Sequence, residues 1–89
     1  MSKPVRFTQH ARRKFDDLAA MGFVVTEAQV IDTVRNPDHV DESVDPPVAQ
    51  KAVSQRHVLR VVFVEDEETT LVITFYPGRR TRYESQNAV

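Results

Sequence analysis

Two apolar runs toward the C-terminal end of the chain have the spacing of paired β-strands. They cover residues 58–64 and 71–76, and the polar link between them is short enough for an antiparallel hairpin. We expect Phe63 to pair with Leu71, which places Arg60 opposite Thr74 because strand side chains alternate between faces. The face directed toward the core is then expected to carry the bulky apolar side chains, namely Leu59, Val61, Phe63, Leu71, Ile73 and Phe75.

An amphipathic helix is predicted ahead of these strands, over about residues 9–21. Thr8 is a suitable N-cap, and Gly22 is a suitable C-terminal stop. Apolar side chains recur on one face at helical spacing, so Phe15 and Leu18 are the expected core contacts.

A second helix is predicted to begin after Thr26. Thr26 and Gln29 fit a capping box, in which each side chain accepts a hydrogen bond from the backbone N–H of the other residue. Asn36 and Pro37 are expected to end this helix, because the residue before a proline disfavours helical geometry. The short link between the two helices favours a packed helical pair.

Two further strands are expected before the hairpin, at about residues 39–44 and 48–53. The first is short and acidic, which is typical of an edge strand. A two-residue turn at positions 55–56 would place Lys51 opposite Arg60 and keep the ammonium group off the core face.

This order of elements, two helices and then four strands, is typical of an α+β fold. We expect the two N-terminal helices to pack on one face of a four-stranded, mostly antiparallel sheet. The 89 residues suffice for a single domain. Its ordered core is expected at about residues 5–78, followed by a C-terminal tail, residues 79–89, that is prone to fray.

The face of the sheet away from the helices is predicted to be apolar enough to need cover. On the expected register it carries Val62, Val64 and Val72. The tail, a second copy of the chain or a partner protein would provide that cover.

The composition excludes several classes of protein and site. The chain has no cysteine, which removes disulfides, thiolate zinc sites and cysteine nucleophiles. We see no signal peptide and no segment apolar enough to span a membrane. A cytoplasmic protein without membrane contacts is therefore expected.

A net charge of −1 conceals strong segregation of charge along the chain. Residues 1–14 are basic, with Arg12 and Arg13 at the start of the first helix, where backbone N–H groups also favour phosphate. Residues 15–45 are acidic, and the tail is basic again through Arg79 and Arg80. These basic segments either converge into an anion-binding patch or form ordinary mixed surface charge.

The candidate chemistry is a cationic cluster without metal or cofactor. The three histidines lack the spacing of a metal motif, and there is no glycine-rich phosphate loop. Lys51 opposite Arg60 would be destabilising unless an anion such as phosphate lay between them. Thr74 would donate a hydroxyl hydrogen bond, and His10 is the expected general acid or base, with His57 as an alternative.

Arg60 also has a simpler interpretation. A cation in the middle of an apolar strand is costly unless water, an anion or a carboxylate meets it. Solvation, or pairing with an acid such as Glu42, would make Arg60 structural. His10 has a similar alternative as an ordinary surface residue at a helix start.

The order of these motifs resembles a known family. His10 opens a basic helix, a Thr-x-x-Gln helix ends in Asn36-Pro37-Asp38, and two apolar strands follow at residues 60–64 and 72–77. Over about residues 7–83 this arrangement resembles the family called domain of unknown function 4258. The resemblance implies a fold like that of RelE/ParE-type toxins and of barnase-like and colicin-like ribonucleases, and with it metal-independent RNA cleavage.

The comparison with RelE-type toxins also implies which residues take part. Basic residues on the sheet and an arginine–tyrosine set near the C-terminus would act in cleavage. Arg60, Arg79, Arg80 and Tyr83 stand at such positions.

Three functions follow as hypotheses. The first is a ribonuclease toxin, in which His10 takes the ribose 2′-OH proton while Lys51, Arg60 and a tail arginine stabilise the developing charge. The second is a non-enzymatic interaction module, expected to be a homodimer through the apolar sheet face, which a toxin would instead offer to an antitoxin protein. The third is nucleic-acid binding without cleavage, with salt-sensitive affinity.

Overall fold

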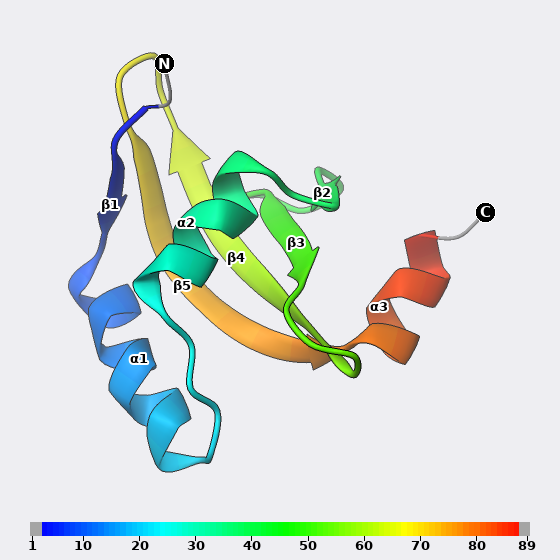
Figure 1. Ribbon diagram of the computed structural model, residues 1–89. Coiled ribbons are helices and arrows are strands. Elements are labelled where there is room, and N and C mark those ends of the chain that lie inside the picture. The colour runs from blue at the N-terminus through cyan, green and yellow to red at the C-terminus, as the bar shows by residue number, and fades with distance from the viewer. Residues whose placement is uncertain (1–2, 88–89) are drawn as a thin grey trace.

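A twisted mixed sheet crosses the molecule, with two helices covering one side and a third at the far end of its longest strand (Figure 1). The computed structural model describes residues 3–87. The elements are β1 (Val5–Phe7), α1 (Gln9–Ala20), α2 (Glu27–Arg35), β2 (His39–Asp41), β3 (Val48–Ala52), β4 (His57–Glu65), β5 (Thr70–Arg79) and α3 (Arg80–Asn87).

The α+β class is confirmed, but the sheet has five strands where four were predicted. Over the described residues the strand order is β1-β5-β4-β3-β2, with the β1–β5 pair parallel and the other three pairs antiparallel. The additional strand, β1, consists of three residues that pair with Thr70–Val72 at the start of β5. A segment this short carries no usable alternation, so its pairing depends on the neighbouring edge of β5.

Helix α1 begins and ends where the sequence indicates. The hydroxyl of Thr8 accepts a hydrogen bond from the backbone N–H of Ala11 at 3.0 Å, as an N-cap does. The same hydroxyl donates to the carbonyl of Ile73 at 2.9 Å, so the cap also fastens α1 to β5. Gly22 follows the helix with φ of +85°, a conformation that glycine adopts without steric cost.

Helix α2 has the predicted capping box. The backbone N–H of Gln29 donates to the Thr26 hydroxyl at 3.1 Å, and the backbone N–H of Thr26 donates to the Gln29 side chain at 2.9 Å. The helix ends at Arg35, and Asn36 forms its C-cap before Pro37.

The core lies between α1, α2 and the sheet. Phe15 of α1 packs at the centre of an aromatic row, with its ring centroid 4.7 Å from that of Phe75 and 5.8 Å from that of Phe7. The buried cluster draws on both helices, on the link between them and on β4 and β5, through Ala11, Leu18, Val25, Val30, Leu59, Val61, Val72 and Phe75.

The predicted pairing of β4 with β5 is wrong by one residue near the turn and by two residues at Arg60. Phe63 pairs with Val72 and not with Leu71, and Arg60 pairs with Tyr76 and not with Thr74. The register shifts between Val62 and Phe63, where β5 contains one extra residue, Ile73, so this position is a β-bulge. Three consecutive apolar residues at 71–73 hide such a shift from any alternating pattern.

The bulge changes which side chains reach the core. Val72 is fully buried in the core cluster, whereas Leu71 and Ile73 are only partly buried. Val72 therefore leaves the interaction face that the sequence suggested. On that face Val64 is 40% exposed and Val62 is partly buried.

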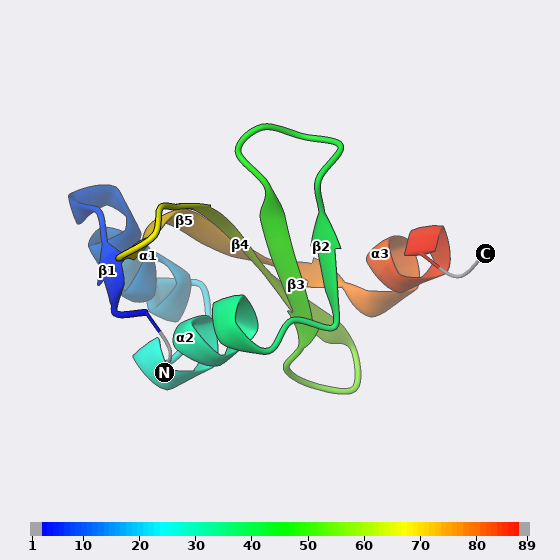
Figure 2. The same ribbon diagram turned by 90° about the horizontal axis from the view of Figure 1, so that it is seen from above.

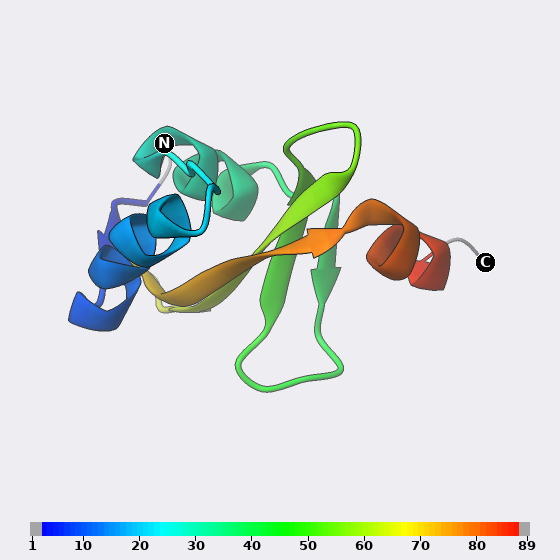
Figure 3. The ribbon, with the colours of Figure 1, turned by 90° about the horizontal axis from the view of Figure 1, so that it is seen from below.

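The C-terminal segment is the helix α3, where a tail was predicted. Pro77 and Gly78 do not end the last strand, because β5 continues to Arg79 and passes directly into α3. Views from above and from below place α3 beyond the end of β5, away from α1 and α2 (Figure 2 and Figure 3). The last two residues of the predicted tail, 88–89, lie outside the described residues.

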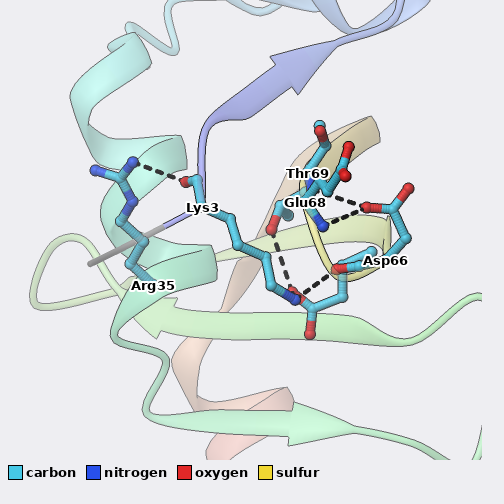
Figure 4. Close-up of polar contacts among 7 residues, drawn as sticks. Lys3, Arg35, Asp66, Glu68 and Thr69 are labelled. Carbon is cyan, nitrogen blue, oxygen red and sulfur yellow. Dashed lines mark hydrogen bonds and ion pairs between the residues drawn. The ribbon is translucent and has the colours of Figure 1, made fainter.

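The opposite end of the hairpin is tied to the N-terminal segment. Lys3 donates from its ammonium to the backbone carbonyl of Asp66 at 2.6 Å, and Arg35 donates to the carbonyl of Lys3 at 3.0 Å (Figure 4). The Asp66 carboxylate accepts hydrogen bonds from the backbone N–H groups of Glu68 and Thr69, both at 2.8 Å. These two bonds lower the pKa of Asp66, because they favour its charged form.

Candidate functional site

Arg60 lies on β4 in a closed polar network. Its side chain donates to the amide oxygen of Gln50, the residue directly opposite on β3, and donates from Nε to the hydroxyl of Tyr76 at 3.1 Å. Its Nη2 lies 3.7 Å from a carboxylate oxygen of Asp41 on β2. The arginine is only 8% exposed, so this network satisfies its charge within the protein.

Asp41 is held in its charged form for this role. The hydroxyl and then the backbone N–H of Ser43 are the main causes that lower the pKa of Asp41, and the nearby charge of Arg60 lowers it further. The expected carboxylate partner was Glu42, so the ion pair is formed by the neighbouring residue in the sequence.

Helix α3 contacts Arg60 on the face of the sheet away from α1 and α2. The guanidinium of Arg60 lies 4.2 Å from the centre of the Tyr83 ring and 5.9 Å from that of Tyr76, which are cation–π contacts. Arg60 is thus held between the sheet and α3. This arrangement is the one expected from the structural interpretation of Arg60.

Lys51 lies on the other face of the sheet from Arg60. It pairs with Leu59, one position away from the predicted partner. The backbone N–H of Val53 donates to the carbonyl of His57, so the turn holds three residues instead of two. Its ammonium lies 3.2 Å from the carboxylate of Asp32 and donates to the backbone carbonyl of Asn36 at 2.8 Å. A cation at the C-terminal end of α2 is stabilised by the helix dipole, and this accounts for Lys51 on the helical side.

His10 and Thr74 do meet. A ring nitrogen of His10 lies 3.1 Å from the hydroxyl oxygen of Thr74, beside the edge of β5 beyond its pairing with β1. His10 is exposed at the start of α1. The predicted catalytic set is therefore divided, because Arg60 and Lys51 have acidic partners of their own.

The two arginines predicted on α1 differ in their surroundings. Arg12 lies 3.1 Å from the carboxylate of Glu27 and 4.7 Å from the centre of the Phe7 ring, so it links the two helices and β1. Arg13 is exposed on the same helix.

The basic residues of the C-terminal segment gather around a pocket of about 360 Å³, here called the basic pocket. It lies between the loop joining β3 to β4 and the junction of β5 with α3. Its walls bring together three arginines and a histidine with two uncharged polar residues, namely Arg56, Arg79, Arg80, His57, Gln55 and Thr81.

Local hydrogen bonds hold the two walls of the basic pocket together. The backbone N–H of Arg80 donates to the carbonyl of Arg56 at 2.8 Å, and the Arg80 side chain donates to the carbonyl of Ser54 at 3.3 Å. Arg80 also forms an ion pair with Glu84 at 2.8 Å. Arg79 of β5 lies directly opposite His57 of β4 in the strand register. Three guanidinium groups against one carboxylate leave the pocket positively charged.

A second, apolar pocket of about 260 Å³ adjoins the other side of His57. The link between α1 and α2 forms one wall, with the ring of Phe23 4.7 Å from the His57 ring and nearly perpendicular to it. The remaining walls come from α2, the β3–β4 loop, β4 and β5. We call this the apolar pocket.

The residues that line the basic pocket receive different predictions from the sequence. Arg79 and Arg80 are among the predicted binding residues and His57 is the predicted alternative base, whereas Arg56 was assigned to a tight turn. The signal that joins them is the length of the hairpin, since a β5 strand extended to Arg79 places that residue opposite His57.

Residues 3–87 meet the requirements neither of a metal site nor of a membrane-spanning helix. No group of three or more histidine, aspartate or glutamate side chains there is placed to hold a metal ion. Within the same residues, no helix is long and apolar enough to cross a membrane.

Comparison of the chain with models of protein families, with curated proteins and with solved structures finds no match.

Proposed function

We propose that this domain binds single-stranded RNA through phosphate groups held in the basic pocket. The observation that carries the proposal is that three arginines and a histidine line one pocket. Arginine grips phosphate oxygens in a bidentate fork, and electrostatic contact with the backbone supplies most non-specific affinity for nucleic acid. A pocket suits the exposed phosphates of a flexible single strand better than it suits a regular duplex.

The charge distribution along the β4–β5 hairpin supports the proposal. The basic pocket lies at the end where β4 begins and β5 finishes, and the acidic turn at Glu65–Glu68 lies at the other end (Figure 1). An approaching polyanion is therefore attracted to one end and repelled from the other. This polarity permits RNA binding by a chain whose net charge is −1.

A direct test measures the binding of a fluorescently labelled RNA oligonucleotide by anisotropy at several salt concentrations. The affinity is expected to fall as salt rises, with a log–log slope of about −0.7 for each phosphate neutralised. Arg56→Ala and Arg79→Ala each remove an exposed cation of the basic pocket and should weaken binding and flatten that slope.

Arg13→Ala is the matched control, because it removes an exposed arginine from α1, outside the basic pocket. It should leave affinity close to that of the unmodified protein. Equal losses in all three variants, or no salt-dependent binding at all, would contradict the proposed site.

Metal-independent cleavage of the bound RNA is a second candidate, favoured by the position of His57 in the wall of the basic pocket. In this scheme His57 takes the proton of a ribose 2′-OH. The 2′-oxygen then attacks the adjacent phosphorus, the bond to the 5′-oxygen breaks, and that oxygen leaves with a proton from the solvent. The products are a 2′,3′-cyclic phosphate and a 5′-hydroxyl, and the arginines stabilise the charge on the phosphate oxygens.

Incubation with RNA in EDTA tests this scheme. Cleavage that His57→Ala removes and His10→Ala preserves would support it, because His10 lies beside Thr74 on another part of the surface. RNA that is bound but stays intact leaves binding as the function.

A further inference from the structure

The apolar pocket lies next to the basic pocket, and the two share a wall. His57 lines both, and the β3–β4 loop contributes Ser54 to the first and Gln55 to the second. A ligand that fills both must therefore join an apolar portion to an anionic portion across a single side chain. A nucleotide has this arrangement, with its base separated from its phosphate by one sugar.

The apolar pocket offers surfaces that suit a flat ring. Phe23 presents an aromatic ring, and bases released from stacking in a single strand commonly settle against aromatic and aliphatic side chains. Val24, which also lines this pocket, is 77% exposed. The other apolar walls are Val25, Val53, Leu59 and Pro77.

Polar groups in the same pocket distinguish a base from a lipid chain. Ser54 accepts hydrogen bonds from the backbone N–H groups of Arg56 and His57 at 3.3 and 3.1 Å. Its hydroxyl hydrogen donates to no group of residues 3–87 in these bonds, so it is available as a donor. Gln29 uses its amide oxygen to cap α2. Its NH₂ group takes no part in this bond, so among the described contacts it is a second available donor. Two donors suit the carbonyl and ring-nitrogen acceptors of a base edge, whereas an alkyl chain has no use for them.

We infer that the apolar pocket binds one nucleobase of the strand whose phosphate lies in the basic pocket. This inference rests on the proposed function and gives its binding unit, a whole nucleotide held on both sides of His57. Phe23 supplies the stacking surface, and Gln29 and Ser54 supply the donors to the base.

The test compares two small probes by NMR titration of the unmodified protein. Ribose 5-phosphate carries the anion without a base, and uridine monophosphate carries both. Ribose phosphate should shift the amide signals of the basic pocket alone, at Arg56, His57, Arg79 and Arg80. Uridine monophosphate should also shift the signals of Phe23, Val24 and Val53 and should bind about tenfold more tightly, a reasonable contribution for one stacked base.

Phe23→Leu supplies an independent check, because it keeps an apolar side chain in the pocket wall but removes the aromatic ring. It should bring the affinity for uridine monophosphate close to that for ribose phosphate and leave the latter unchanged. Met21→Leu is the matched control, since Met21 is an exposed apolar residue of the same link but lies outside the pocket lining.

The outcomes separate the inference from the function on which it rests. If both probes bind with equal affinity and shift only the basic pocket, the base site is wrong and phosphate binding stands. If neither probe nor RNA shifts the basic pocket, the proposed function itself fails. A fatty acid that shifts the apolar pocket when uridine monophosphate does not would also overturn the base site.

Discussion

Tyr83 lies against the backbone of Gly78, in the space that a side chain at position 78 would occupy. The same tyrosine ring covers the guanidinium of Arg60. Gly78 has no unusual backbone conformation, so its missing Cβ serves to admit α3 to the face of the sheet. Attachment of the C-terminal helix therefore depends on one absent methyl group.

Gly78→Ala is expected to displace the Tyr83 ring and loosen α3. The added methyl group collides with that ring, and overpacking of this kind costs about 1–3 kcal/mol of unfolding free energy. Tyrosine fluorescence reports the change, because the chain has two tyrosines and no tryptophan. Gly22→Ala is the control: it strains a backbone with φ of +85° but meets no atom within 4 Å, so it should lower stability without changing the surroundings of Tyr83.

Arg60→Ala is expected to lower the unfolding free energy by about 2–4 kcal/mol. Removal of the cation leaves the buried amide of Gln50 and the carboxylate of Asp41 without their partner, and such orphaned groups are costly. The urea midpoint measures this loss. Arg79→Ala, at an exposed position, should stay within about 0.5 kcal/mol of the unmodified protein. A smaller loss at Arg60 than at Arg79 would show that Arg60 is not a structural residue.

The stability of the protein is expected to fall as the pH drops through the range of its aspartates. The pKa of Asp66 is below the ordinary value of 3.8 in the folded chain and returns to it on unfolding. The unfolded state therefore binds more protons near this pH, so the stabilisation is present above pH 3.8 and lost below it. Asp32 and Asp41 act in the same direction.

Urea midpoints at about pH 6 and about pH 3.5 test this linkage, since they bracket the ordinary aspartate pKa. Asp66→Asn should be less stable at the higher pH and should lose less on acidification than the unmodified protein does. Glu67→Gln changes an exposed carboxylate in the same turn and should retain the full loss. An unchanged loss in Asp66→Asn would contradict the role of the turn.

Lys51 and Asp32 are expected to couple weakly but measurably. A double-mutant cycle with alanine at each position should give a small favourable coupling energy that added salt reduces, because both side chains are partly exposed. Lys51→Ala should leave RNA affinity unchanged, because the ammonium lies at the end of α2 and not in the basic pocket. A marked loss of RNA binding would restore Lys51 to the binding site.

The local signals in the sequence predict the helices well. Thr8 and Thr26 act as caps because a hydroxyl beside a helix start meets backbone N–H groups only one turn away. Pro37 ends α2 for an equally local reason. Such interactions involve residues close in sequence, so no knowledge of the tertiary fold is needed.

The strand registers depend on features that alternation does not encode. The extra residue at Ile73 lies within a wholly apolar run, where either register buries a large side chain. The position of Lys51 on the helical face, which the sequence disfavours, becomes favourable only when the C-terminal end of α2 lies nearby. In both cases the decisive contact comes from an element distant in the sequence.

The candidate site was predicted only in part for the same reason. Arg79, Arg80 and His57 are recognisable as anion-binding or titratable residues, but their meeting around one pocket requires the full length of β5 and the start of α3. In the sequence, Arg60 is an isolated charge in an apolar strand. Its partners, Asp41 and Tyr83, lie on elements that the sequence assigned to an edge and to a tail.

The parallel alignment of β1 with β5 determines how this domain resists force. A pull on the residue before Val5 and on the residue after Arg79 draws the two adjacent strands past each other along their length. Their hydrogen bonds over Val5–Phe7 then bear the load together and do not open one after another. In this pulling geometry the three-residue β1–β5 pair is therefore loaded in shear.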